Sequence, residues 1–191
     1  MSGVDRWPHG IDDGVRDRLL AAYADPRRGY HDTRHLAEVL DHVASLGGDE
    51  VTVLAAWFHD AVYDPMRADN EVASAQLAHV ELAGTGDEDE VARLVRLTAT
   101  HRPGPDDTRG QILCDADLAI LAADDERYAA YVAGVRREYA HVTDEEFDIG
   151  RSRILADLLA KPSLFHTAYG RANWEGRARE NVRAELAQRP G

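Results

Sequence analysis

The chain has 191 residues, of which 44% are hydrophobic and 30% are charged, and its formal net charge is −13, from 22 basic and 35 acidic residues. This length and composition predict one globular domain over residues 1–191. The negative charge argues against broad binding to nucleic acid polymers or to anionic membranes, because both reward clustered positive charge.

No stretch of the sequence reaches the ~18 to 20 apolar residues that a membrane-spanning helix needs. Residues 1–13 lack the basic start and the apolar core of a signal peptide. We therefore expect a cytoplasmic protein that does not bind membranes. Cys114 is the single cysteine, which excludes an internal disulfide and a cysteine-rich zinc site.

Helical periodicity runs through most of the chain, and no alternating strand pattern interrupts it. Capping residues, glycines and prolines divide it into segments. In chain order the expected helices cover about 13–25, 32–46, 51–60, 69–82, 87–100, 112–123, 124–139, 143–160 and 173–188. The sequence thus predicts an all-α fold of about eight to nine helices.

Two of these segments, 51–60 and 112–123, are apolar almost all round, which is typical of helices in a core. Polar residues interrupt both: His59 and Asp60 close the first segment, and Asp115 and Asp117 lie in the second. A buried carboxylate without a partner is costly, so such groups are usually paired, protonated or bound to metal. Because no lysine is near, this pattern favours a bound cation.

His59 and Asp60 are neighbours on a helix and point about 100° apart, so they can share an ion only beside the helix end. The other ligands must come from other helices, and His35 and Asp117 would supply them. Two imidazoles and two carboxylates suit Mn, Fe, Co, Ni or Zn better than an all-oxygen cage for Mg or Ca, although Mg stays an option.

The order His35, His59-Asp60, Asp117 resembles the H…HD…D signature of the HD superfamily. More closely, the sequence is similar to small bacterial stand-alone HD proteins described as predicted metal-dependent phosphohydrolases. The matching stretches are YHDTRHL at 30–36, WFHDAVYD at 57–64, DNEVASA at 69–75, TATH at 98–101 and DADLAIL at 115–121, with shorter ones at 138–139, 150–151 and 178–186. The resemblance covers nearly the whole chain. It implies a single HD-domain helical bundle, with a metal-site core at about 28–125 and C-terminal helices at about 126–188.

The resemblance also implies roles for the metal ligands. His35, His59, Asp60 and Asp117 take the ligand positions of the family. In the DADL segment the family pattern favours Asp117, which leaves Asp115 as a neighbour of the site.

Further residues fall at catalytic positions of the family. Asn70 and Glu71 lie where related enzymes carry an acid near the metal-bound water, which makes Glu71 a candidate general acid or base. The alternative is an acid placed favourably in the first turn of its helix. His101 takes the place of an extra histidine that contacts phosphate or a second metal, or it compensates a helix dipole.

Phosphate needs cationic contacts, and the candidates in the matching segments are Arg34, Arg102 and Arg151. His31 is a further candidate beside the site, where it either orients the site or merely starts its helix. The implied activity is hydrolysis of a nucleotide or another small phosphate ester by a metal-activated water, in a monomer or homodimer. Two alternatives stay open: a di-iron HD-type oxygenase, for which His101 and His79 would have to add ligands, and a non-catalytic metabolite-binding HD protein.

Overall fold

A computed structural model describes residues 6–189, and these residues form ten α-helices and one 3-10 helix without any strand. The prediction of an all-α fold is confirmed. In chain order the elements are α1 (Asp13–Tyr23), α2 (Thr33–Ser45), α3 (Glu50–Phe58), α4 (Asn70–Glu81), α5 (Glu88–Leu97), α6 (Thr108–Leu118), η2 (Ala119–Ala122), α7 (Asp125–Glu138), α8 (Asp144–Ala160), α9 (Ala168–Asn173) and α10 (Glu175–Ala187).

The structure has two more elements than the expected segments. The apolar segment 112–123 continues from α6 into the 3-10 helix η2, and the short helix α9 forms after Pro162. Periodicity does not separate a 3-10 turn from the α-helix that it follows, and six residues are too few to show a period.

Side-chain caps fix the starts of the helices that carry the buried polar residues. Asp32, Asp49 and Asp107 each accept a hydrogen bond from a backbone N–H in the first turn of α2, α3 and α6. Thr143 and Glu146 form a capping box at the start of α8. The positions of these helices along the chain are therefore set largely by local sequence.

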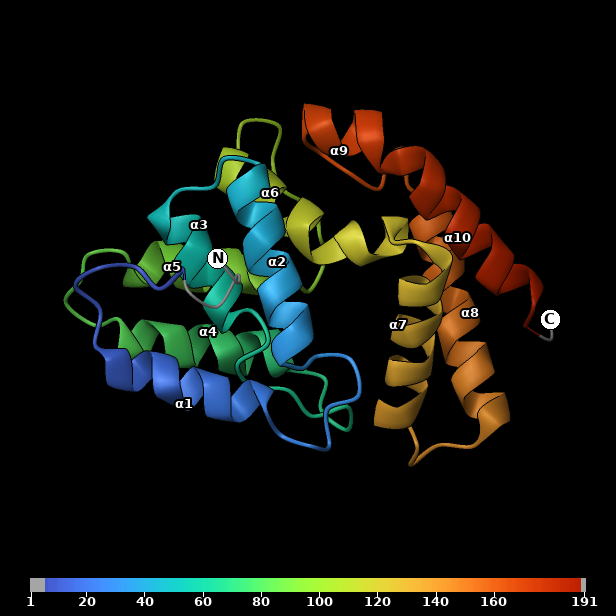
Figure 1. The fold of residues 1–191 in the computed structure, drawn as a ribbon, viewed down its shortest axis with the longest axis horizontal. Coiled ribbons are helices and arrows are strands. Elements are labelled where there is room, and N and C mark those ends of the chain that lie inside the picture. The colour runs from blue at the N-terminus through green and yellow to red at the C-terminus, as the bar shows by residue number, and fades with distance from the viewer. Residues whose placement is uncertain (1–5, 190–191) are drawn as a thin grey trace.

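The apolar side chains form two clusters. The first lies among α1 to α6 and includes the fully buried Trp57 and Phe58. The second lies among η2, α7, α8 and α10 and includes Leu155 and Phe165. Figure 1 shows the same division, with α1, α3, α4 and α5 on one side and α7, α8 and α10 on the other. The chain crosses from one cluster to the other through α6 and η2.

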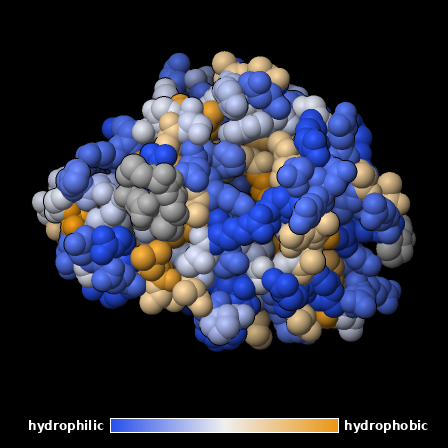
Figure 2. Space-filling view, viewed as in Figure 1, coloured by the Kyte–Doolittle hydropathy of each residue, from blue (hydrophilic) through white to orange (hydrophobic). Residues whose placement is uncertain are grey.

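The face shown in Figure 2 is mostly hydrophilic, with hydrophobic residues in small separate groups. Among residues 6–189, no helix is both long enough and apolar enough to cross a membrane.

Candidate metal centre

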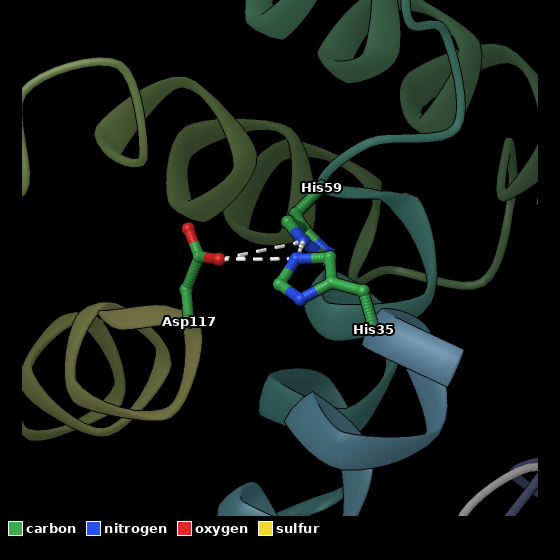
Figure 3. A group of neighbouring side chains, drawn as sticks. All are labelled: His35, His59 and Asp117. Carbon is green, nitrogen blue, oxygen red and sulfur yellow. Dashed lines mark hydrogen bonds and ion pairs between the residues drawn. The ribbon is translucent and has the colours of Figure 1, made fainter. Parts of the chain in front are cut away.

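Three separate elements bring the candidate ligands together. His35 lies in the first turn of α2, His59 directly follows α3, and Asp117 lies in the last turn of α6. Figure 3 shows the two imidazoles and the carboxylate turned toward one another. One ligand atom from each of the three residues lies within 4.8 Å of the other two, so the group could hold a metal ion.

The separations between these atoms fit the ligands of one ion. The Nε2 atoms of His35 and His59 are 3.1 Å apart. Oδ1 of Asp117 lies 3.2 Å from Nε2 of His35 and 3.7 Å from Nε2 of His59. Metal–nitrogen bonds of about 2.0–2.1 Å place neighbouring ligand atoms roughly 3.0–3.4 Å apart. The three residues therefore need little movement to bind a metal.

Asp60 is turned toward the same two imidazoles. Its Oδ2 lies 3.4 Å from Nε2 of His35 and 3.0 Å from Nε2 of His59. Asp60 is not part of the set in which all ligand atoms lie within 4.8 Å, which consists of His35, His59 and Asp117. The structure thus brings all four predicted ligands together. In three of them, His35, His59 and Asp117, the ligand atoms all lie within 4.8 Å of one another.

The charges of the site favour a cation between the histidines. Nδ1 of His59 lies 2.7 Å from the carbonyl oxygen of Ala56, so this nitrogen donates its proton and Nε2 faces the site. Two imidazole lone pairs that meet at 3.1 Å repel each other unless a proton or a metal ion lies between them. Both rings are buried, with 2% of His35 and 1% of His59 exposed, so water cannot relieve this repulsion.

The pKa values show the same preference. Burial by itself would lower the pKa of His35, but the hydrogen bonds to Asp117 and Asp60 outweigh it and raise this pKa to about 10. Burial by itself would raise the pKa of Asp60 and of Asp117, but the neighbouring histidines hold both pKa values below the usual range of a carboxyl group. At neutral pH both carboxylates therefore stay ionised and His35 keeps a proton, which supplies the positive charge that a bound metal ion would otherwise supply.

His101 is fixed against the other oxygen of Asp117. Its Nε2 lies 2.8 Å from Oδ2 of Asp117. The backbone of His101 has a φ of 49°, in the left-handed region that non-glycine residues rarely adopt. Such strain is often found at functional sites, where the surrounding structure holds it. The structure thus brings His101 to the candidate metal centre.

Glu138, for which the sequence analysis predicts no role, holds the loop that leads into α2. This buried carboxylate accepts five hydrogen bonds of 2.8–2.9 Å, from the backbone N–H groups of Gly29, Tyr30 and His31, from Nδ1 of His31 and from the hydroxyl of Tyr63. Burial would raise the pKa of Glu138, but His31 and the backbone donors lower it to about 2. One signal was present in the sequence, since Glu138 continues the buried stripe of Tyr128, Tyr131 and Val135 on α7.

Arg28 is a second residue that the sequence analysis misses. Its guanidinium donates to the carbonyl oxygens of His31 at 3.0 Å, Asp60 at 2.7 Å and Ala61 at 3.0 Å. These bonds tie the loop before α2 to the segment after α3. Arg28 and Glu138 therefore fix the backbone on which His31 and Asp60 are carried.

The candidate phosphate contacts lie in different places. His31 stacks on Tyr63, with ring centroids 4.0 Å apart, and lines a cavity of about 510 Å³ together with Asp117 and His101. Arg151 lines the same cavity. Arg102 lines a separate cavity of about 540 Å³, which it shares with His101.

The fourth candidate, Arg34, is paired with Glu38 at 3.0 Å and lines a smaller cavity of about 200 Å³. His31 and Arg151 are therefore the candidates that share a cavity with the candidate ligand Asp117.

The two candidates at the start of α4 make no hydrogen bond to the four candidate ligands within the described residues. The side chain of Asn70 accepts from the N–H of Asp64 at 3.0 Å and donates to its carbonyl oxygen at 2.9 Å, which pins the turn before α4. Glu71 is half-buried, and after burial its charge is one cause of the raised pKa of Tyr139. Tyr139 lines the 510 Å³ cavity, but Glu71 itself is not among the residues that line it.

Asp115 and Asp117 serve different parts of the molecule. Asp115 is fully buried and accepts hydrogen bonds of 2.7 Å from the N–H of His166 and from the N–H and hydroxyl of Thr167. Asp115 therefore anchors the segment before α9, while Asp117 faces the histidines.

His79, which a di-iron site would need, is exposed on α4 and is paired with Asp89 at 3.2 Å.

Comparisons of the chain with protein-family models, with curated proteins and with solved structures gave no match. The assignment of this site therefore depends on its own geometry and chemistry.

Proposed function

We propose that the protein is a metal-dependent phosphohydrolase of the HD type. The observation that carries the proposal is the buried pair of Nε2 atoms, 3.1 Å apart, with an oxygen of Asp117 at 3.2 Å from one of them. The order of His35, His59-Asp60 and Asp117 along the chain, which resembles the HD signature, supports it. Two imidazoles with carboxylates suit Mn, Fe, Co, Ni or Zn, with Mg as an option.

A divalent ion at this position would make a bound water acidic enough to act as hydroxide near neutral pH and would stabilise charge on phosphoryl oxygens. His35, His59 and Asp117 would hold the ion, with Asp60 beside them. Deep burial of the two histidines excludes water from their side of the site, which strengthens every electrostatic interaction there.

The residues that line the cavity beside the site would act on the substrate. His101 is fixed by Asp117 and is the candidate to protonate the leaving oxygen, with Glu71 as the alternative acid or base. His31, which Glu138 orients through Nδ1, is the candidate to contact the phosphoryl group. The substrate would be a nucleotide or another small phosphorylated metabolite. The protein itself would be a cytoplasmic monomer or homodimer.

The proposal is tested by hydrolysis of p-nitrophenyl phosphate. Protein stripped with EDTA is reloaded with Mn, Fe, Co, Ni or Zn in turn, for wild type, Asp117→Asn and the control Asp106→Asn, which changes an exposed acid in the loop before α6. We expect hydrolysis by wild type and by the control. In Asp117→Asn the rate of hydrolysis should fall by about a hundredfold or more, because mutating even the residues that hydrogen-bond to metal ligands lowers metal affinity or activity by roughly 10–100-fold.

Equal rates in Asp117→Asn and wild type would contradict the proposal, as would metal-loaded protein that hydrolyses no phosphate ester. Oxygen consumption by the iron-loaded protein without phosphate release would favour the oxygenase instead. Tight metabolite binding without turnover would favour the non-catalytic alternative.

A further inference from the structure

The cavity of about 510 Å³ lies between the candidate metal centre and the C-terminal helices. Asp117, His101 and His31 contribute to its wall on the side of the site, and α7 and α8 contribute the opposite wall. Its volume falls in the range of roughly 300–1,000 Å³ that is typical of small-molecule sites. A molecule bound here would therefore touch the candidate ligand Asp117 directly.

The wall that α6, η2, α7 and α8 build is mainly apolar. It includes Leu118, Ile120, Tyr131, Val135, Phe147 and Leu158. Aromatic and aliphatic walls of this kind bind apolar groups, because they remove apolar surface from water.

The two charged residues of this wall, Arg151 and Glu146, leave no unpaired cation for a ligand. Arg151 is buried and donates to the two carboxylate oxygens of Glu185, at 2.9 and 3.0 Å. Glu146 accepts from the N–H and hydroxyl of Thr143 in the capping box of α8. Arg151 cannot neutralise an anionic group of a ligand without giving up Glu185, and the contacts with Thr143 lower the pKa of Glu146, so Glu146 keeps a negative charge. This wall therefore disfavours a second anionic group.

Tyr30 contributes a buried aromatic ring to this cavity beside the candidate metal centre. This residue is 5% exposed and lines the cavity, and among the described residues its buried hydroxyl has no hydrogen-bond partner. Its ring centroid lies 4.6 Å from that of His35, so it stands directly beside the candidate metal centre. Since the hydroxyl is closed off from solvent, Tyr30 presents mainly its ring to the cavity, and its apolar surface adds to the apolar wall.

We propose that the substrate is a phosphate monoester of an uncharged, largely apolar alcohol or phenol, whose organic group fills this cavity while its phosphoryl group faces His31, His101 and Asp117. This inference rests on the proposed function. In the reaction, the oxygen of water forms a bond to phosphorus and the bond from phosphorus to the ester oxygen breaks. The electron pair leaves on the ester oxygen, which takes up a proton, so the products are inorganic phosphate and the free alcohol.

The test compares kcat/KM for 1-naphthyl phosphate, glycerol 3-phosphate and ATP in the metal-loaded protein. We expect 1-naphthyl phosphate to be preferred about tenfold or more over both of the others, since each buried methylene-sized group is worth roughly fourfold in affinity. Preference for ATP or glycerol 3-phosphate would overturn the inference.

Two glycines give a matched pair of variants. Gly150 on α8 lines the cavity, Gly176 on α10 does not, and a Cβ added at either position meets no atom within 4 Å. Gly150→Leu narrows the cavity, and Gly176→Leu is the control. We expect Gly150→Leu alone to lower the preference for 1-naphthyl phosphate over glycerol 3-phosphate by about tenfold. If Gly150→Leu kept the wild-type preference for 1-naphthyl phosphate over glycerol 3-phosphate, the organic group of the substrate would not bind in this cavity.

Binding of 1-naphthol, measured by isothermal titration calorimetry, separates this inference from the proposed function. If no ester is hydrolysed but 1-naphthol binds to wild type and Gly176→Leu and not to Gly150→Leu, the proposed function fails and the apolar site stands. If esters are hydrolysed without preference and 1-naphthol does not bind, the proposed function stands and this inference fails.

Discussion

Glu138 shows how much of the site depends on one residue outside it. Its carboxylate is the acceptor for three consecutive backbone N–H groups and for the ring of His31. Hydrogen bonds to a buried charge are stronger than neutral ones, and donors left without an acceptor add a desolvation cost. The loop before α2 and the orientation of His31 are therefore set by a residue on α7.

Glu138→Gln removes this charge, and we expect it to lower the free energy of unfolding at pH 7 by about 3 kcal/mol. The amount follows from the pKa, which is lowered from 4.5 to about 2 by the contacts of the folded state. Because the folded pKa is depressed, this stability is present above pH 4.5 and is lost as the pH falls through about 2.

Urea denaturation between neutral and acidic pH measures this effect. Wild type should lose stability toward pH 2 faster than Glu138→Gln does. Glu126→Gln, an exposed change on the same helix, should behave like wild type. A cost in Glu138→Gln no larger than that in Glu126→Gln would show that the carboxylate does not hold the loop.

Among the elements, the contact of α7 with the loop before α2 depends on two glycines. A Cβ added to Gly134 would lie 2.6 Å from the carbonyl oxygen of Gly29, and a Cβ added to Gly29 would lie 2.2 Å from that of Gly134. Both obstacles are backbone atoms, so a side chain at either position must separate the two segments. This close approach is what lets Glu138 reach the N–H groups of the loop.

We expect Gly134→Ala to destabilise the protein by about 1–3 kcal/mol, although alanine favours a helix over glycine. Gly150→Ala on α8 is the control, because its Cβ meets nothing within 4 Å and it should gain up to about 1 kcal/mol. Thermal unfolding of both variants gives the comparison. An equal gain in stability in both would mean that α7 does not need this contact.

The same elements show what the sequence could predict. Caps and periodicity are local, so α2 and α3 lie close to where the sequence predicts them, whereas α6 begins at Thr108, four residues before the predicted segment 112–123, and ends at Leu118, where η2 takes over. His59, Asp60 and Asp117 can be predicted as site residues because they are polar residues within apolar helical segments. The structure brings them next to His35. The sequence did not reveal the role of Glu138, since it acts on a loop about 108 residues away. Local patterns do not show which distant segments meet.

The cavity and the left-handed backbone conformation of His101 could not be predicted from the sequence, because both depend on how distant segments pack. The cavity wall combines loops, α6, η2, α7 and α8, and only the packing of the two halves creates it. The left-handed φ of His101 arises at a non-glycine residue, where sequence favours the ordinary helical or extended regions. For Asn70, Glu71 and the arginines, the proposed roles remain predictions.

At the scale of the molecule, the candidate metal centre joins α2, α3 and α6. Without metal, its carboxylates hold protons on the histidines, and the pKa of His35 is raised from 6.5 to about 10. A raised folded pKa contributes stability that is complete below pH 6.5 and is lost as the pH rises through about 10. Metal binding must displace such protons, so metal affinity should also fall as the pH decreases.

We therefore expect the melting temperature of EDTA-treated protein to fall between pH 6.5 and 10, and to fall less in His35→Gln, which lacks the titrating group. Differential scanning calorimetry across this range measures both profiles. Added metal should raise the melting temperature of wild type most at the alkaline end. If the melting temperatures of wild type and His35→Gln fell equally with rising pH, the carboxylates would not be holding a proton on His35 as described.

The central claim is that His35, His59 and Asp117 bind a transition metal, and metal content per chain tests it most directly. Wild type, His59→Ala and the control His79→Ala are stripped with EDTA, incubated with Mn, Fe, Co, Ni or Zn, desalted and analysed by elemental mass spectrometry, with folding checked by circular dichroism. His79 is exposed and outside the site. The account predicts about one ion per chain in wild type and His79→Ala and almost none in folded His59→Ala. No bound ion in wild type, or equal content in all three proteins, would contradict it.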